Sequence, residues 1–239
     1  MYKEYSTVQL SNPNASKGES PIFRNADYQT FKPSKSVSTL YEVFESGLSI
    51  ARKRPFLGTR HGDTYKWQTY SQVDEQRTLL GSFLCALFDA SNGSKNVGIY
   101  AINRAEWVVG EQACNAYSLV TVALYDTLGS DSLEFIVNHA ELSVILMSRD
   151  KVESVLKMAH KCPSLKVIVS MDKLEGAADG VLKKWAKDRG VRLLDYEEAF
   201  KEGKKRIMAH RPPKKDDLAS IAYTSGTTGV PKGALITHR

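Results

Sequence analysis

The residues best suited to chemistry lie close together near the end of the chain, between Thr224 and Gly233. Glycines allow the backbone to approach a ligand closely, and successive N–H groups in such a loop can surround an anion. Hydroxyl side chains add hydrogen-bond donors, and Lys232 adds a mobile positive charge. No acidic residue occurs between Leu218 and Arg239. The predicted cradle for a polyphosphate consists of Thr224, Ser225, Gly226, Thr227, Thr228, Gly229, Lys232 and Gly233.

Two common phosphate-binding motifs do not match this stretch. A Walker A loop has Gly-Lys-Ser/Thr after four intervening residues, but the residue at that distance from Gly226 is Pro231. No G-x-G-x-x-G run occurs here, so the dinucleotide fingerprint is missing. On composition alone, an ordinary surface loop rich in glycine and threonine is an equal alternative.

The order of the residues is more informative than their composition. The run Tyr-Thr-Ser-Gly-Thr-Thr-Gly-x-Pro-Lys-Gly from Tyr223, followed by Thr237 and His238, closely resembles the phosphate loop of the adenylate-forming enzymes. The resemblance implies that the loop holds the β- and γ-phosphates of ATP while a substrate carboxylate attacks the α-phosphate. It also implies two catalytic residues: Lys232, which neutralises phosphate charge, and His238, which matches a family position close to the substrate.

The cofactors implied by this resemblance are ATP and Mg²⁺, with coenzyme A as a co-substrate. Preorganised donors and a metal ion stabilise charge that gathers on phosphate oxygens, so we expect backbone N–H groups of residues 226–229 at the pyrophosphate end. Ser225, Thr227 and Thr228 each carry a hydroxyl that suits the metal. We take Thr227 as the candidate metal ligand, although the sequence does not choose among the three.

Blocks upstream of the loop resemble one branch of the family, the long-chain acyl-CoA synthetases. The most branch-specific block is Tyr-Asp-Thr-Leu-Gly at 125–129; the others are Tyr-Lys-Trp at 65–67, Asn-Arg at 103–104 with Glu-Trp at 106–107, and Asn-His-Ala-Glu at 138–141. This resemblance implies activation of a long-chain fatty acid to an acyl-adenylate and then to acyl-CoA. The alternatives are a ligase for another carboxylic acid and a non-catalytic, truncated nucleotide-binding form.

Apolar runs alternate with helical patterns from residue 96 onward. Strands are expected at 97–101, 119–124, 144–147, 165–169, 191–194 and 218–222, and a hairpin at 56–60 and 64–69. Polar residues three apart predict helix caps at Ser71/Asp74, Asn103/Glu106, Asp131/Glu134, Asp150/Glu153 and Asp195/Glu198. The pattern predicts an α/β fold with a mostly parallel sheet and helices on both faces. By resemblance, it is the first part of the large N-terminal domain of an adenylate-forming enzyme.

The sequence is expected to form an N-terminal arm followed by one larger domain. Residues 1–54 are expected to form an N-terminal arm with one packing helix at 39–51, and residues 55–239 an incomplete AMP-binding (adenylation) domain. The adenine motif, the acidic magnesium ligand and the C-terminal lid domain of the family have no counterpart in this sequence. We therefore expect an N-terminal fragment of a ligase that is inactive alone.

Several other residues have a structural interpretation. Trp67 and Tyr70 are expected to be packing residues, and Cys114 inert packing inside an apolar helix face. His139 lies near a helix end, where it is expected to cap or pack. Asp126 and Thr127 follow a strand, where a structured turn is the main interpretation and a ligand site the alternative.

Composition excludes several function classes. The content of hydrophobic residues is 42% and that of charged residues 25%, both ordinary for a globular protein. No apolar run reaches the length of a membrane span, and the three cysteines are too scattered for a disulfide framework. No nucleic-acid-binding signature accompanies the net charge of +6, so no nucleic acid partner is expected. The resemblance implies an intracellular enzyme associated with a membrane surface, at the cytoplasmic face of the endoplasmic reticulum or a lipid droplet, or in the peroxisome.

Overall fold

The computed structural model describes residues 7–9, 18, 23–25, 37–90, 94–125, 130–224 and 230–239. The chain divides into two compact units, Met1–Val37 and Ser38–Arg239. In the first unit, strands β1 (Thr7–Gln9) and β2 (Phe23–Asn25) form an antiparallel pair. The second unit contains every other element described below.

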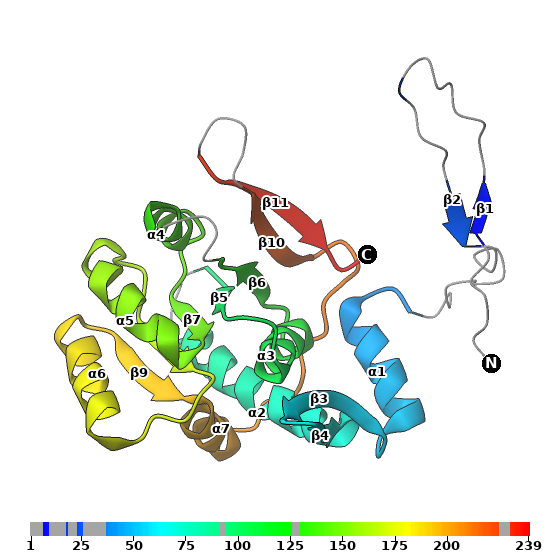
Figure 1. Cartoon of the computed structure of the whole chain (residues 1–239), viewed down its shortest axis with the longest axis horizontal. Helices are drawn as coiled ribbons and strands as arrows, with labels where there is room; N and C mark the ends of the chain where they lie inside the picture. The colour runs from blue at the N-terminus through cyan, green and yellow to red at the C-terminus, as the bar shows by residue number, and fades with distance from the viewer. Residues whose placement is uncertain are drawn as a thin grey trace. The chain divides into compact units, whose positions relative to one another are not determined.

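A seven-stranded sheet is the centre of the second unit, as far as its described residues show (Figure 1). Its order is β11-β10-β6-β5-β7-β8-β9, and every neighbouring pair is parallel except β10 and β11, which are antiparallel. The strands are β5 (Asn96–Tyr100), β6 (Val120–Ala123), β7 (Val144–Met147), β8 (Val167–Ser170), β9 (Arg192–Asp195), β10 (Leu218–Thr224) and β11 (Lys232–Thr237). The predicted, mostly parallel α/β sheet is confirmed.

Helices cover both faces of this sheet. They are α1 (Leu40–Ala51), α2 (Tyr70–Asp89), α3 (Ala105–Ala116), α4 (Ser130–His139), α5 (Arg149–Met158), the short η4 (Ala159–Lys161), α6 (Gly176–Asp188) and α7 (Tyr196–Lys205). Alternate side chains of β7 show the two faces: Val144 and Leu146 pack in a core with α1, α2, α3 and α7, while Ile145 and Met147 pack in a second core with α4, α5 and α6. Burial on both faces explains why these strands are continuous apolar runs.

The predicted hairpin and first helix are also confirmed. Strands β3 (Pro55–His61) and β4 (Thr64–Thr69) pair across a turn in which Gly62 has a φ of 59°. Helix α1 begins after Thr39, whose side chain accepts from the Glu42 N–H in a capping box. Trp67 packs as predicted, but on the surface: it is 53% exposed, covers Gly58 and stacks with Tyr65.

Helix caps were the least predictable feature. Only the Asp195/Glu198 pair forms the expected capping box, at the start of α7. Helix α2 is capped by Thr69 with Gln72, so the prediction for Ser71 and Asp74 is wrong. The hairpin ends directly at Thr69, which places the first free N–H groups of the helix beside that side chain.

The remaining predicted caps fail because their carboxylates find other partners. Helix α3 starts after Arg104 and has no side-chain cap; Glu106 accepts a hydrogen bond from Arg104 Nε at 2.7 Å instead of pairing with Asn103. Helix α5 starts after Ser148, so Asp150 lies in its first turn and Glu153 pairs with Lys157. Helix α4 starts at Ser130 and has Asp131 in its first turn, while Glu134 pairs with Lys161.

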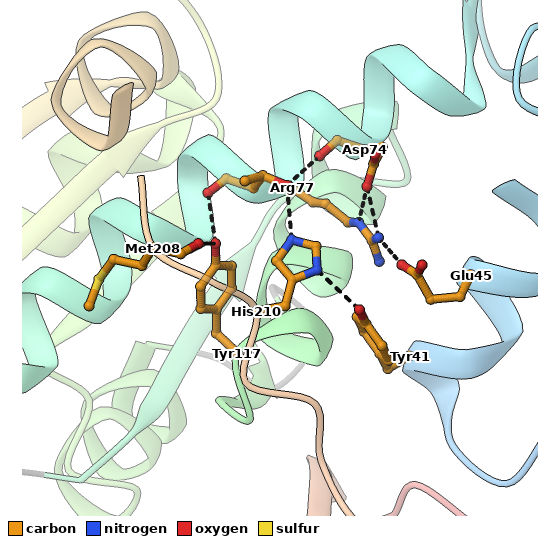
Figure 2. A network of polar contacts seen from close by, with 8 residues as sticks. Tyr41, Glu45, Asp74, Arg77, Tyr117, Met208 and His210 are labelled. Carbon is orange, nitrogen blue, oxygen red and sulfur yellow. Dashed lines mark hydrogen bonds and ion pairs between the residues drawn. The ribbon is translucent and has the colours of Figure 1, made fainter. Parts of the chain in front are cut away.

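A buried arginine joins the first helices (Figure 2). The Arg77 side chain on α2 has no exposed surface. Its guanidinium donates to Asp74 Oδ1 at 2.8 Å and to Glu45 of α1, and it lies over the ring of Phe44 with its carbon 4.0 Å from the ring centroid. Two carboxylates and an aromatic face therefore replace most of the water that this charge gave up, although Nη1 has no hydrogen-bond partner among the described residues.

The chain that returns from α7 to β10 is fixed beside this arginine. Both ring nitrogens of His210 form hydrogen bonds. Nδ1 lies 3.2 Å from Tyr41 Oη, and Nε2 lies 2.9 Å from Thr78 Oγ1. Tyr117 Oη donates to the carbonyl oxygen of Met208 at 2.8 Å (Figure 2). Burial, together with the charge of Arg77, lowers the pKa of His210, so the neutral ring is favoured here. These bonds set the path by which the chain enters β10.

Helices α2 and α7 approach so closely that only a glycine fits between them. A Cβ added at Gly203 would lie 1.9 Å from the carbonyl oxygen of Leu79, a backbone atom that cannot move aside alone. Gly203→Ala is therefore expected to lower the free energy of unfolding by about 2–3 kcal/mol, measured by urea denaturation.

The matched control for this substitution is Gly180→Ala in α6. Gly180 is exposed, and a Cβ there meets no atom within 4 Å. Because alanine favours helix, this control should raise the free energy of unfolding by about 0.5–1 kcal/mol. Equal effects of the two substitutions would contradict the close packing of α2 on α7.

Candidate functional site

The predicted phosphate-binding residues belong to the hairpin formed by β10 and β11. Thr224 pairs with Lys232 across this hairpin, and Tyr223 pairs with Gly233. Opposed residues of an antiparallel pair have Cα atoms about 4.5–5.5 Å apart, so the two ends of the loop are held together. The described ends, Thr224 and Lys232, are both exposed. The middle of the predicted cradle lies outside the described residues: Ser225, Gly226, Thr227, Thr228 and Gly229.

The base of the loop is anchored on helix α4. The Tyr223 side chain is 5% exposed, and its hydroxyl lies 2.6 Å from His139 Nδ1. The His139 ring stacks on Phe135 with ring centroids 5.1 Å apart. Burial raises the pKa of Tyr223, so the hydroxyl stays protonated and can donate to the imidazole. His139 thus packs, as predicted, and it also fixes the residue that precedes the loop.

Gly233 completes this anchor for a steric reason. A Cβ at this position would lie 2.9 Å from Ile221 Cγ2 and 3.2 Å from the ring of Tyr223. A larger residue would push the tyrosine ring off β11 and loosen the pairing beside Lys232. Gly233 is therefore needed where the chain leaves the loop, whatever the loop binds.

The loop lies at an edge of the sheet that suits a ligand site. Strand β10 is parallel to β6, so Thr224 lies at the edge where the parallel strands have their carboxyl ends. Ligands of open α/β sheets bind outside this edge. Lys232 makes no ion pair among the described residues, so its charge is free for an anion.

Charged residues farther along the same edge neutralise one another. Arg104, after β5, donates to both carboxylate oxygens of Asp172, after β8, at 3.0 and 2.8 Å. Asp172 also accepts from the Arg149 N–H at 2.8 Å. Burial opposes the charge on Arg104, but hydrogen bonds to Asp172 and Glu106 more than offset it and raise its pKa. This pair is absent from the residues predicted above, because its two members lie 68 positions apart in the sequence.

His238 lies away from the loop. It follows β11, at the end opposite Lys232, and six residues of strand span roughly 20 Å. Its side chain is 4% exposed, and neither ring nitrogen has a hydrogen-bond partner among the described residues. Burial lowers its pKa, against the opposing effect of Asp217. The structure therefore does not bring His238 to the phosphate loop, and its catalytic role stays a prediction.

The part of the chain that the structure describes has no cluster of metal ligands and no exposed thiol. The described residues contain no group of three or more His, Cys, Asp or Glu side chains that could hold a metal ion. Magnesium bound to a nucleotide takes most of its ligands from phosphate and water, so the hydroxyl of Thr227 remains the predicted protein ligand.

Cys114 is buried, and its burial raises its pKa, which confirms its interpretation as inert packing. No helix in the described part of the chain has the length and apolar character needed to cross a membrane.

Comparison with proteins of known sequence gives a consistent result. Long-chain-fatty-acid–CoA ligase 1 of Cavia porcellus is 42% identical over 207 residues, covering 85% of this chain and 29% of the relative. Long chain acyl-CoA synthetase 7, peroxisomal, of Arabidopsis thaliana is 38% identical over 213 residues, covering 87% of this chain and 30% of the relative. The chain thus spans about 30% of the length of these curated relatives.

Solved structures share the fold at lower sequence identity. The adenylation domain of a carboxylate reductase from Mycobacterium chelonae superposes with a TM-score of 0.72 at 18% identity, covering 86% of this chain and 35% of that one. An anthranilate CoA ligase in complex with anthranoyl-AMP gives a TM-score of 0.68 at 20% identity, covering 87% and 36%. The family model described as "AMP-binding enzyme" matches residues 50–239. The chain therefore belongs to the AMP-binding, adenylate-forming enzyme family, and its resemblance to the long-chain acyl-CoA synthetases is confirmed.

Proposed function

We propose that this chain supplies the phosphate-binding part of a ligase that activates long-chain fatty acids with ATP and coenzyme A. The observation that carries the proposal is the β10–β11 hairpin, which holds Thr224 and Lys232 on either side of a glycine- and threonine-rich loop at the carboxyl edge of the sheet. Relatives that are 38–42% identical and named as long-chain ligases support this substrate class.

The chemistry explains why such a loop is needed. A fatty carboxylate is a poor electrophile, so one of its oxygens first attacks the α-phosphorus of ATP and pyrophosphate leaves. The thiolate of coenzyme A then attacks the acyl carbon of the adenylate, and AMP leaves. Charge gathers on the phosphate oxygens during the first step, and donors that are already oriented stabilise it without reorganisation. A bound Mg²⁺ would add positive charge at the same phosphates.

We assign the roles of the loop residues on this basis. Backbone N–H groups of residues 226–229 bind the pyrophosphate end of ATP, and Thr224, Ser225 and Gly233 border it. Lys232 neutralises phosphate charge, and Thr227 carries the hydroxyl that contacts Mg²⁺. His238 acts nearer the acyl substrate, at the far end of β11. Within this proposal, residues 1–54 form an N-terminal arm and residues 55–239 the first part of the adenylation domain.

The place of the reaction follows from its substrate. Fatty acids and their coenzyme A esters partition to lipid surfaces, so we place the enzyme at an intracellular membrane surface or in the peroxisome. One relative is named as peroxisomal. No nucleic acid partner is part of the proposal.

The first test asks whether these residues work within a ligase. A chimera that joins residues 1–239 to the downstream residues of the Cavia porcellus relative should release pyrophosphate with palmitate and show little release with anthranilate. Residues 1–239 alone should release none, because they match only 29% of that relative. If the 239-residue chain alone formed AMP in the presence of palmitate, our proposal that this chain is inactive by itself would be refuted.

The second test concerns Lys232. Lys232→Met removes the free positive charge at the loop and is expected to weaken ATP binding by about tenfold, as for a lost charge-assisted contact at an exposed site. Isothermal titration with ATP provides the measurement. Lys215→Met, which removes another exposed lysine from the polar segment before β10, is the matched control and should leave ATP affinity unchanged. Equal affinity in the two variants would remove Lys232 from the site.

The third test concerns the anchor of the loop. Tyr223→Phe and His139→Phe remove the same 2.6 Å hydrogen bond from opposite sides. Each is expected to weaken ATP binding by about 3–10-fold, and the double variant no further, because the loop loses the same restraint each time. Tyr65→Phe, at a tyrosine that is 56% exposed, is the control. Additive losses in the double variant would show that the two residues do not act as a unit.

A further inference from the structure

A cavity lies away from the phosphate loop and shares no residue with it. Its volume is about 280 Å³, and it is bounded by α1, the start of β3, the start of α2, and α3. One wall is apolar and largely aromatic. That wall consists of Leu40, Val43, Phe44, Phe56 and Tyr70.

The shape of the aromatic wall is set by its own packing. The rings of Phe56 and Tyr70 stack with centroids 4.2 Å apart, and Phe44 meets Phe56 at 5.6 Å in an edge-to-face arrangement. Leu40 and Val43, which border the cavity on α1, remain 38% and 58% exposed. The cavity therefore has a fixed apolar side and is open to a ligand from solvent.

The opposite wall is polar and belongs entirely to α3. Asn115 is 1% exposed, yet neither its amide nitrogen nor its amide oxygen has a hydrogen-bond partner among the described residues. Gln112 Oε1 is likewise buried without a partner. Glu111 lies beside them and forms no hydrogen bond or ion pair in the described part of the chain. The spacing of the three residues puts them on one side of the helix.

Unpartnered groups of this kind are rare in folded proteins. Nearly all buried polar side-chain atoms are hydrogen-bonded, because a lost partner leaves the cost of desolvation unopposed. Here two amide side chains with missing partners line the same cavity as an aromatic wall. An apolar pocket with a few convergent polar groups is the usual form of a small-molecule site.

The types of polar atom restrict the ligand. Asn115 Oδ1, Gln112 Oε1 and the Glu111 carboxylate are acceptors, and the NH₂ groups of Asn115 and Gln112 are donors. Among the described residues that line the cavity, Glu111 is the only acidic or basic side chain, and it would repel a carboxylate or a phosphate. We propose that this cavity is a binding site for a small organic amine, with an aromatic or aliphatic body against the apolar wall and an ammonium group against Glu111, Gln112 and Asn115.

Glu111 supports this assignment in a second way. Burial raises the pKa of Glu111, so its charged form is disfavoured in the unliganded protein, where it has no ion-pair partner among the described residues. An ammonium would supply that partner. Fatty acids, ATP and acyl-adenylates are anions, and this site is consequently distinct from the proposed substrate site.

The experiment uses 2-phenylethylammonium as the probe and the 239-residue chain. Titration is followed by NMR through the side-chain NH₂ signals of Asn115 and Gln112, which we expect to shift on binding. Ethylbenzene, which lacks the charge, should bind at least tenfold more weakly, and 3-phenylpropionate should not shift these signals. No shift with the amine would mean that ordered water alone occupies the cavity, and equal binding of the carboxylate would overturn the assignment of an amine.

Two variants separate a binding role from a structural one. Asn115→Leu should weaken binding of the amine at least tenfold, yet raise Tm by about 2–4 °C or more, because it removes a buried amide that has no partner. Glu111→Gln should also weaken amine binding at least tenfold and leave ethylbenzene binding unchanged. A lower Tm in Asn115→Leu with unchanged binding would assign Asn115 a purely structural role and refute the proposal.

The chain offers a matched control for Asn115. Asn96 is partly buried, but its amide nitrogen donates to the Ala140 carbonyl oxygen at 2.9 Å. Asn96→Leu removes a satisfied hydrogen bond, so it should lower Tm and leave amine binding unchanged. Opposite changes in Tm for the two asparagines would identify the missing partner at Asn115 as the distinguishing feature.

Discussion

Burial of the Arg77 charge is the constraint on which much of the first core depends. A guanidinium removed from water is tolerated only when carboxylates surround it, and losing one partner of such a group costs about 3–5 kcal/mol. Its partners come from two helices: Asp74 on α2 and Glu45 on α1. Because His210 contacts residues of the same two helices, the path of the chain into β10 depends on this arrangement as well.

The candidate site is built from a reversal in an otherwise parallel sheet. A parallel strand would carry the chain away from the carboxyl edge, whereas the antiparallel β11 brings Lys232 back opposite Thr224. Both ends of the loop are thus part of one ladder. The loop gains a fixed entry and exit without needing a cap or a disulfide, and the hydrogen bond from Tyr223 to His139 adds a support from outside the sheet.

Local sequence signals predicted the elements well and their long-range contacts poorly. The run Val144–Met147 was recognisable as a strand because it is apolar on both faces, and Gly62 marked the hairpin turn. Polar and acidic residues three apart gave several wrong helix caps. The same spacing also occurs where the second residue pairs elsewhere, as Glu153 does with Lys157 in a surface ion pair. The bond between Arg104 and Asp172 joins residues 68 positions apart, and no local pattern encodes it. The loop was predicted from its own residues, but its anchor on α4 was not.

The order of the strands bears on how the protein is made. Strand β10 pairs with β6, and the partners Ser220 and Thr121 lie roughly 100 residues apart, whereas β7, β8 and β9 follow one another along the chain. During synthesis, β5 to β9 can assemble while β10 is still inside the ribosome. The hairpin that carries the phosphate loop is therefore synthesised after these strands, and a nascent chain can acquire β5 to β9 before it acquires its site.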